Sequence, residues 1–478
     1  MNIKSLKTLI IILLISQIPS LKAKTKTPQL QETDKKELLK KIGELVKDHY
    51  VYPDLGKEYA KEISKLYLSS EFDHVGDPKE FGEKVTDALQ KLTNDKHIKF
   101  RLIEASELGE NTKGSLHHPV RYHRLGQKEH LGIFRLDWIE NEIGYLDYRR
   151  FYNQKKAKKM LTDALRFLSI ANAVIIDLRE NGGGSGNLIP WLISYFLPHP
   201  TQLTGTYYRN HDSLEEWWTL ERVEGKRLLD VPLFILIGKN TFSSAEYFAY
   251  DLKVRNRATL IGEASKGGAH SVDLYPVGDN FEIYISTARA VNPVTGTNWE
   301  GTGIAPDIAV PSESALDRAI ELAKEAAQEY GKSKDAKITE AVKRMQGQLD
   351  QAEKFFKGSD VNQAESLLES AFQTGMQADL IDEFFIQVLA YHYSSLENYR
   401  MSIWLLEKHT QLYPETTNGY AALAWTYYKA GEKKLALKQF EKVLELDKRN
   451  SVAKRMLKEL KEEKPQTIPG NSIVMQAA

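Results

Sequence analysis

A serine stands where a strongly apolar segment gives way to an amphipathic one. The segment VPLFILI occupies residues 231–237, and TFSSAEYFAYDL follows at residues 241–252. Ser243 precedes Glu246 by three residues, which is the spacing of a helix capping box, so the pattern predicts a buried strand and then a helix. A serine at a strand-to-helix turn is also where several hydrolases place their nucleophile. Ser243 is therefore a candidate both for a helix cap and for an attacking residue.

An attacking serine needs backbone donors that hold the oxyanion formed in acyl transfer. The N–H of Ser244 lies in the first turn of the expected helix, where N–H groups lack intrahelical partners and the dipole favours negative charge. The glycine turn DLRENGGGSG at residues 177–186 is the expected second source, with Gly183 and Gly184 as candidates. This turn matches neither dinucleotide nor phosphate-loop patterns, and the alternative is an ordinary tight turn.

The overall composition argues against some classes of binding partner and excludes disulfide bonds. The chain has 478 residues, with 65 Lys and Arg against 65 Asp and Glu. A net charge of zero leaves no basic footprint, which argues against nucleic acid or an anionic membrane as the main partner. The chain contains no cysteine, so it has neither a disulfide framework nor a cysteine for lipid attachment.

The first 23 residues have the pattern of a secretory signal peptide. MNIKSLK carries positive charge, TLIIILLISQIPS is mainly apolar, and cleavage is expected after Ala23. The mature protein is therefore expected to be exported to the periplasm, to the cell envelope or to the medium. The alternative is a signal that remains uncleaved and anchors the chain.

The rest of the chain changes character twice. Helical periodicity predicts an N-terminal helical domain at residues 24–97, and short apolar runs alternating with helical stretches predict an α/β core at residues 98–315. A linking helix is expected at residues 316–344, repeats at 345–462 and a flexible tail at 463–478.

The repeats resemble the tetratricopeptide family, whose units bury a face only by stacking. Residues 417–450 fit one unit, residues 383–416 a second, and residues 345–378 a degenerate third, with matching positions at Leu423, Ala424, Tyr427, Ala436, Phe440, Leu389, Ala390, Tyr393, Leu406, Pro414, Ala352, Phe355, Ala364, Leu368 and Ala371. Their aromatic side chains are expected to pack between helices or to line a groove for a protein partner.

Three longer stretches carry a resemblance to a known family. DLRENGGG, then TFSSAEYFAYDLKVRNRATLIGEASKGGAH, then NPVTGTNWEGTGIAPDI resemble the tail-specific (carboxyl-terminal processing) serine peptidases, and more closely the branch that contains the tricorn core and the interphotoreceptor retinoid-binding protein. The resemblance covers about residues 30–315. It implies a crotonase-like (ClpP/crotonase) α/β peptidase core in which Ser243, rather than Ser244, is the nucleophile.

The resemblance also implies which residues assist the serine. The main branch of the family has a lysine base 25 residues after the serine, where this chain has Gly268, and Lys266 lies two residues short of that position. The tricorn-like branch instead implies His97 in NDKHIKF as the base and Glu300 in NWEGTGIAPD as the carboxylate that orients it. The preceding Lys96 departs from the small residue that is usual there. The alternatives are a structural histidine at 97 and a solvated loop carboxylate at 300.

The expected function is that of an exported serine peptidase acting on extended peptides, with no cofactor and no metal. The histidines of SLHHPVRYHRLGQKEH fit no zinc signature, so a loop or strand edge is expected there. The short spacing between His97 and the next strand leaves no room for a PDZ domain of ordinary size. Two other functions stay open: a non-catalytic binding scaffold, and a different acyl chemistry on the same fold.

Overall fold

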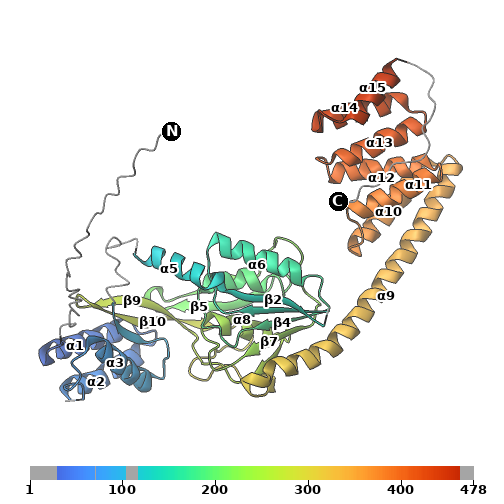
Figure 1. Cartoon of the computed structure of the whole chain (residues 1–478). Coiled ribbons are helices and arrows are strands. Elements are labelled where there is room, and N and C mark those ends of the chain that lie inside the picture. The colour runs from blue at the N-terminus through green and yellow to red at the C-terminus, as the bar shows by residue number, and fades with distance from the viewer. Residues whose placement is uncertain (1–28, 70, 104–116, 141, 463–478) are drawn as a thin grey trace, which may run out of the picture. The chain divides into compact units, whose positions relative to one another are not determined.

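The computed structural model describes residues 29–69, 71–103, 117–140 and 142–462. The expected signal peptide and the expected tail lie outside these ranges. The chain divides into two compact units, Met1–Tyr330 and Gly331–Ala478. Figure 1 shows the helices and strands along the chain. Each unit is built around hydrophobic clusters of its own.

The first unit begins with three amphipathic helices, α1 (Glu32–His49), α2 (Pro53–Leu68) and α3 (Pro78–Thr93). The carboxylate of Asp77 accepts hydrogen bonds from the N–H groups of Lys79 and Glu80, which satisfies two orphan donors at the start of α3. The apolar faces of these helices pack together with residues of three strands described below, among them Phe100, Val277 and Phe281. The helices therefore share a core with the second sheet.

The first sheet has six strands in the order β11-β8-β7-β4-β3-β2. Its strands are β2 (Ile133–Ile139), β3 (Ile143–Tyr148), β4 (Ala173–Asp177), β7 (Leu233–Ile237), β8 (Thr259–Gly262) and β11 (Ile308–Ala309). All neighbours pair in parallel except β2 with β3. The central strands β4 and β7 are buried throughout, as expected for a parallel sheet that is covered on both faces.

Helices cover both faces of this sheet. On one face, α6 (Lys155–Leu168), the short α7 (Ile189–Ile193) and α8 (Ser244–Lys253) pack into the main cluster of the unit. On the other face lies the beginning of α9 (Ala315–Lys357), where alanines recur every fourth residue from Ala315 to Ala327 and are buried against the sheet. Small side chains on one face of a helix allow this close approach.

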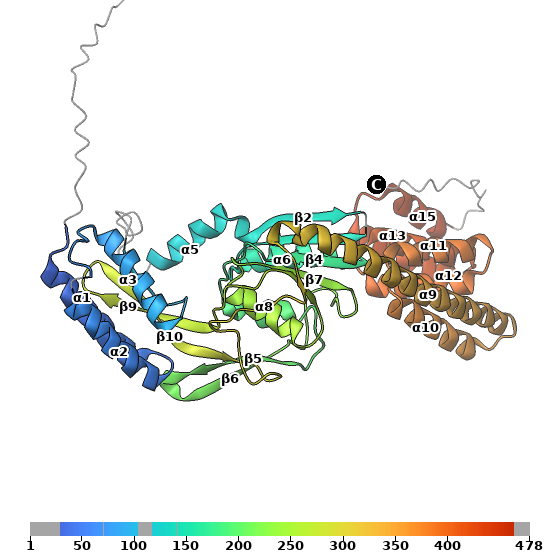
Figure 2. The ribbon, with the colours of Figure 1, turned by 90° about the horizontal axis from the view of Figure 1, so that it is seen from below.

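A second, antiparallel sheet lies beyond α8. It has the order β1-β10-β5-β6, with β9 paired to β10, and its strands are β1 (Lys99–Leu102), β5 (Gln202–Tyr208), β6 (Ser213–Trp218), β9 (His270–Val277) and β10 (Phe281–Val291). Figure 2 shows α8 between the two sheets, and Tyr247 of α8 donates its hydroxyl proton to the carbonyl of Thr204 in β5. The sequence patterns indicated only β10 of this sheet, because β6 and β9 carry many exposed residues, β1 is short, and polar residues and Gly205 interrupt β5.

The histidine-rich segment is helical. Residues His117–Lys128 form α5, followed by a short 3₁₀ turn at His130–Gly132, where a loop or strand edge was expected. That expectation was wrong because the polar side chains of this segment hid a helical period. Tyr122 and Leu125 of α5 pack against a small cluster that contains Leu131 and Tyr152.

The second unit contains only helices in its described residues. After α9 come α10 (Val361–Gln377), α11 (Glu383–Ser395), α12 (Tyr399–Leu412), α13 (Thr417–Lys429), α14 (Lys433–Leu446) and α15 (Ser451–Lys461). The helices that begin at residues 383, 417 and 451 are 34 residues apart, and so are those that begin at 399 and 433. The expected boundary at 344 falls inside α9, which runs without a break to Lys357.

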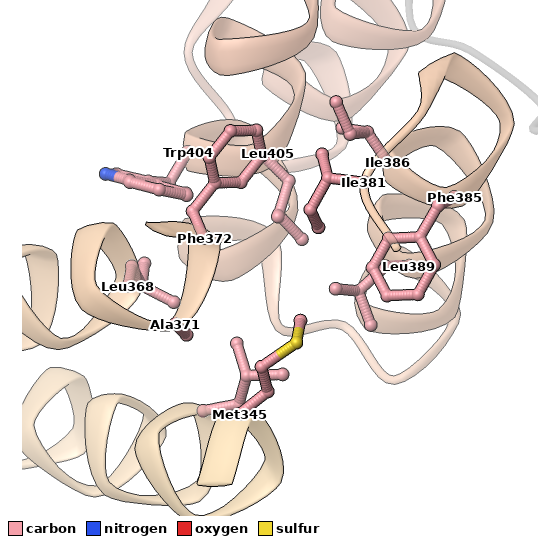
Figure 3. A pocket seen from close by; sticks show the side chains of 11 residues that line it. Met345, Leu368, Ala371, Phe372, Ile381, Phe385, Ile386, Leu389, Trp404 and Leu405 are labelled. Atoms are coloured by element: carbon pink, nitrogen blue, oxygen red, sulfur yellow. The ribbon is translucent and has the colours of Figure 1, made fainter. Parts of the chain in front are cut away.

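Most of the expected repeat positions are buried in the core of this unit, but Phe355 and Pro414 are exposed and Leu389 is only partly buried. Phe355 is 37% exposed, while its neighbour Phe356 packs against the cluster. Tyr393 and Tyr427 are buried, and Trp404 and Trp425 are partly buried against the same cluster, so these aromatic residues pack between helices. An internal space of about 10 Å³, lined by Met345, Phe372, Leu389 and other apolar side chains, is too small and too apolar to be a ligand site (Figure 3).

Candidate active site

Ser243 stands at a sharp turn between β7 and α8. Its backbone has φ 56° and ψ −119°, a combination that a residue with a side chain rarely adopts. The turn is held in place because Thr241 Oγ1 donates to the carbonyl of Leu178 at 2.7 Å and the N–H of Phe242 donates to the carbonyl of Asn181 at 3.0 Å. The strained serine is therefore imposed by the surrounding strands.

Glu246 joins this turn to the loop that leads into β9. Its side chain is fully buried and accepts four hydrogen bonds, from the backbone N–H groups of Ser243, Gly267 and Gly268 and from the hydroxyl of Ser265, at 2.6–2.9 Å. Burial raises the pKa of this carboxyl, and the four donors oppose that rise. The sequence pattern indicated only the contact with Ser243 that belongs to a capping box.

The glycine turn lies directly against the serine. A Cβ at Gly183 would lie 2.9 Å from Ser243 Cβ, and one at Gly184 would lie 2.3 Å from the carbonyl oxygen of Phe151. Both glycines have positive φ, so other residues would be strained there as well as crowded. The turn therefore requires glycine at both positions.

The two expected glycine donors are used differently. The N–H of Gly183 donates to the side-chain oxygen of Asn181 at 2.8 Å, so it is already engaged and cannot serve as a free oxyanion donor in this arrangement. Among the described residues, the N–H groups of Gly184 and Ser244 have no acceptor. The hydroxyl of Ser244 donates to the carbonyl of Gly184 at 3.0 Å, which brings these two groups together. Asn181 was not singled out from the sequence.

His97 lies next to the serine turn but does not bond to it. Its ring stacks obliquely on that of Phe242, with 4.4 Å between the centroids. Burial lowers the pKa of His97 to about 4, and the nearby Asp95 carboxylate offsets only part of this effect. Within the described part of the chain, both buried ring nitrogens of His97 lack a partner, so the ring bonds neither to Ser243 nor to Glu300.

Gly268 explains why His97 and Phe242 can lie together. A Cβ at Gly268 would lie 2.2 Å from Phe242 Cε2 and 2.6 Å from His97 Cε1. The backbone of Gly268 is fixed on both sides, since its N–H donates to Glu246 and its carbonyl accepts from the indole N–H of Trp299. The two rings therefore occupy the space that a side chain at position 268 would need.

Glu300 is held by backbone groups of the β9 strand. Its Oε2 accepts from the N–H of Ala269 at 2.5 Å and from the N–H of His270 at 3.0 Å, and it lies 3.6 Å from His270 Nδ1. Burial raises the pKa of Glu300 to about 7. Glu300 thus contacts His270, a residue that was not singled out from the sequence, where an orienting contact with His97 was expected.

Asp95 and His270 form a buried pair beside these residues. Asp95 Oδ2 lies 3.1 Å from His270 Nδ1, and Asp95 Oδ1 accepts from the backbone N–H of His97 at 2.9 Å. Asp95 is 1% exposed and His270 is 5% exposed. Both residues stand inside quoted motifs, NDKH and SKGGAH, so the sequence contained them, but their contact joins segments 175 residues apart.

Asp95, His270 and Glu300 each offer one potential metal ligand, and these atoms lie within 4.8 Å of one another. The carboxylates already have donors: Glu300 Oε2 accepts two backbone N–H groups, and Asp95 Oδ2 accepts the hydroxyl of Tyr50 as well as the imidazole. An internal hydrogen-bond network accounts for this cluster, and no step of the chemistry below passes through a metal.

Two lysines near the site, Lys96 and Lys266, make contacts at the loop before β9. Lys96 donates its ammonium group to the carbonyl of Lys266, and the ammonium of Lys266 lies 5.0 Å from the ring centroid of Phe242. The backbone N–H of Lys266 donates to the carbonyl of Thr241 at 3.0 Å. Lys96 is therefore tied to the loop that carries Gly268.

Comparison with known proteins gives matches to the N-terminal helical part and to the α/β core of the first unit. Residues 142–310 match peptidase family S41, and residues 23–129 match the N-terminal domain of peptidase S41 in eukaryotic IRBP. The chain is 28% identical over 182 residues to a carboxy-terminal-processing protease of Bartonella bacilliformis, which covers 36% of this chain and 39% of that protein. It is 29% identical over 153 residues to a carboxyl-terminal-processing protease of a Synechocystis species, over 32% of this chain and 34% of the relative.

The chain thus spans about two fifths or less of the length of these curated relatives. Among solved structures, a putative peptidase from Parabacteroides merdae is 16% identical and covers 62% of this chain and 97% of its own, with a TM-score of 0.42. The serine turn, the glycine turn and Glu300 all fall within the matched residues 142–310. The core of the first unit is thus similar to peptidase family S41, and the curated relatives that share this similarity are carboxyl-terminal-processing proteases.

Proposed function

We propose that this chain is a serine peptidase in which Ser243 attacks the carbonyl carbon of a peptide bond. The observation that carries the proposal is the backbone of Ser243, at φ 56° and ψ −119°. Strain of this kind persists only where the surrounding structure imposes it, and at the end of a parallel strand it presents a nucleophile ahead of a helix N-terminus. A serine that served only as a helix cap would have extended backbone dihedrals and no strain.

In the proposed reaction, His97 removes the proton from Ser243 Oγ as the C–O bond forms. The N–H groups of Ser244 and Gly184 hold the oxyanion, with the positive end of the α8 dipole behind Ser244. His97 then gives its proton to the leaving amine as the C–N bond breaks, and water hydrolyses the acyl-enzyme by the same route. Attack requires His97 to come within hydrogen-bonding reach of Oγ, and such contacts are often long without substrate.

The space at Gly268 supports His97 as the base. The family resemblance implies a lysine base at this position in the main branch, but here the rings of His97 and Phe242 fill the room that a side chain at 268 would need. The depressed pKa of His97 also leaves its ring neutral, and so able to accept a proton, over most of the pH range.

A probe for activated serines tests the proposal on protein that begins at Lys24. A fluorophosphonate is expected to label the wild type and the control variant Ser271→Ala, and to label neither Ser243→Ala nor His97→Ala. Lys266→Ala tests the other base: loss of labelling there with retention in His97→Ala would assign the proton transfer to the lysine. Absence of labelling in folded wild-type protein would contradict the peptidase.

A second function has a specific observation in its favour. Both ring nitrogens of His97 are buried without a partner in the described part of the chain, and the ring makes no bond to Ser243. A non-catalytic scaffold that binds a ligand or a protein would tolerate this arrangement. In that case Ser243→Ala and His97→Ala would leave the binding function unchanged.

We also propose that the chain is exported and that its second unit is a tetratricopeptide array that docks a protein. Among the described residues, no helix is long and apolar enough to cross a membrane. The array is supported by the 34-residue spacing of its helices, and docking by an exposed stripe on α11, where Phe384, Val388 and Tyr391 are 42–66% exposed. Cell fractionation tests the first proposal, and loss of a captured partner in Phe384→Ala/Tyr391→Ala tests the second.

A further inference from the structure

The segments that carry His97 and Glu300 are joined through two residues that the proposed reaction does not use. Glu300 Oε2 accepts the backbone N–H of His270, the ring of His270 bonds to Asp95, and Asp95 accepts the backbone N–H of His97. We propose that Asp95 and His270 are a positioning pair that connects Glu300 to the main chain of His97. The inference rests on the peptidase function proposed above and names the residues that hold its base.

The charge and the orientation within the pair are set by its surroundings. Although burial alone would raise the pKa of Asp95, the hydrogen bond and the charge of His270 hold it at about 2, so Asp95 is an anion. An anion only accepts, and His270 Nδ1 must therefore carry the proton that faces it. In the described part of the chain, His270 Nε2 has no partner.

Asp95 acts on His97 in two ways. Its Oδ1 fixes the backbone N–H of His97 at 2.9 Å, and its charge raises the pKa of the His97 ring against the effect of burial. The other groups whose charges act on that ring are His270 on β9 and Lys266 on the loop before it, and both lower its pKa. Removal of the Asp95 charge would therefore lower the pKa of His97 further.

Asp95 has a third donor besides the backbone N–H of His97 and the ring of His270. The hydroxyl of Tyr50, at the end of α1, donates to Asp95 Oδ2 at 3.2 Å. The rings of Tyr50 and Tyr52 lie edge-on to His270, with centroids 6.3 and 5.8 Å away. Elements from three parts of the first unit thus enclose the pair. Such enclosure is what an orienting group needs, because the position of the base must be precise.

The variants Asp95→Asn and His270→Gln test the pair. Asp95→Asn places an amide where the imidazole donates and removes the charge, while His270→Gln keeps a side chain that can donate to Asp95. Their controls are Glu282→Gln, a buried carboxylate paired with Arg101 in the second sheet, and His409→Gln, a buried histidine of the second unit. Fluorophosphonate titration gives the concentration of active serine sites in each variant. The measured rate divided by this concentration gives kcat for each active site.

For Asp95→Asn, kcat for each titrated site is expected to fall at least about tenfold, as when an orienting carboxylate is lost, with KM nearly unchanged. His270→Gln should fall less, and the acid limb of the pH profile should move to lower pH in Asp95→Asn. Both controls should retain the wild-type kcat for each site. A purely structural pair would lower the number of titrated sites and the melting temperature but leave kcat for each site and the pH limb unchanged.

Two outcomes separate this inference from the proposed function. If the wild type is neither labelled nor active, the peptidase fails and the positioning role fails with it. If the wild type is labelled and both pair variants keep its kcat for each site, only the positioning role is overturned. Histidine NMR titration gives a reading without substrate: the pKa of His97 should be lower in Asp95→Asn, and an unchanged pKa would contradict the link.

Discussion

At the scale of single residues, two glycines of the same turn, two positions apart, differ sharply in what surrounds them. A Cβ at Gly184 would lie 2.3 Å from the Phe151 carbonyl oxygen, whereas a Cβ at Gly182 would have no heavy atom within 4 Å. Gly184 also has φ 138°, a backbone conformation that L side chains rarely adopt. The glycine-rich run therefore needs glycine at positions 183 and 184 but not at position 182.

This difference gives a matched pair of variants. Gly184→Ala should displace the turn and the N–H that we assign to the oxyanion, so fluorophosphonate labelling of Ser243 should slow at least about tenfold. Gly182→Ala should label at the wild-type rate. Equal slowing in both variants would show that the turn tolerates no substitution at all and would remove the argument for Gly184 as a donor.

Glu300 predicts a pH dependence of stability. Its pKa is about 7 in the folded chain against an ordinary value of 4.5, so the folded state favours the protonated acid. The stability that this group contributes is present in full below pH 4.5 and is lost as the pH rises through 7. Glu300→Gln, which resembles the protonated form, should therefore be more stable than wild type at pH 8 and nearly equal to it at pH 5.

Urea unfolding at the two pH values measures this difference. A stability difference that is the same at pH 5 and pH 8 would contradict the raised pKa.

At the scale of elements, α8 is fixed to the β8–β9 loop by a single buried carboxylate. Glu246 accepts four hydrogen bonds, and three of their donors lie at residues 265–268. The cap of one helix therefore also fixes the loop on which Gly268 leaves room for the rings of Phe242 and His97. The position of the helix and the position of the base thus depend on the same group.

Glu246→Gln should destabilise the first unit by about 3 kcal/mol, because an amide nitrogen would face donors that need an acceptor. The measurement is the free energy of unfolding in urea. Glu180→Gln is the control, since Glu180 is exposed and accepts a single hydrogen bond within the described part of the chain, from Asn240. A loss of less than about 1 kcal/mol in Glu246→Gln would show that the loop has other sufficient supports.

At the scale of the whole molecule, the two units have separate hydrophobic clusters and so should respond separately to damage. Gly419 on α13 is a suitable position for a destabilising substitution in the second unit, because a Cβ there would lie 2.2 Å from Nδ1 of the buried His409. Gly419→Ala should lower the melting temperature of one calorimetric transition by several degrees. Gly431→Ala, which meets no neighbour within 4 Å, serves as a control for space, although its φ of 85° adds strain.

Labelling of Ser243 in Gly419→Ala should equal that of the wild type if the units are energetically independent. Reduced labelling at temperatures where the first unit remains folded would show that the second unit supports the serine site. Either result is obtained on the full chain.

The amino-acid sequence by itself determined the serine turn and the glycine turn. It also determined the N-terminal helices, the helices of the second unit and most strands of the parallel sheet. These features are local: a continuous apolar run marks a buried strand, a positive φ calls for glycine, and a capping pair stands three residues apart. The family resemblance added the expectation of a peptidase core, and the comparisons support family S41.

Only the tertiary structure decided which polar groups meet. Glu300 contacts His270 and not His97, Gly183 is engaged by Asn181, and Asp95 pairs with a residue 175 positions away. The strands β6 and β9 were not predicted because exposed residues blur their alternation, and β5 because Thr204, Gly205 and Thr206 interrupt its apolar pattern. Hydrogen bonds and burial depend on residues that folding brings together. The spacing of residues along the chain does not show which distant residue each polar group will contact.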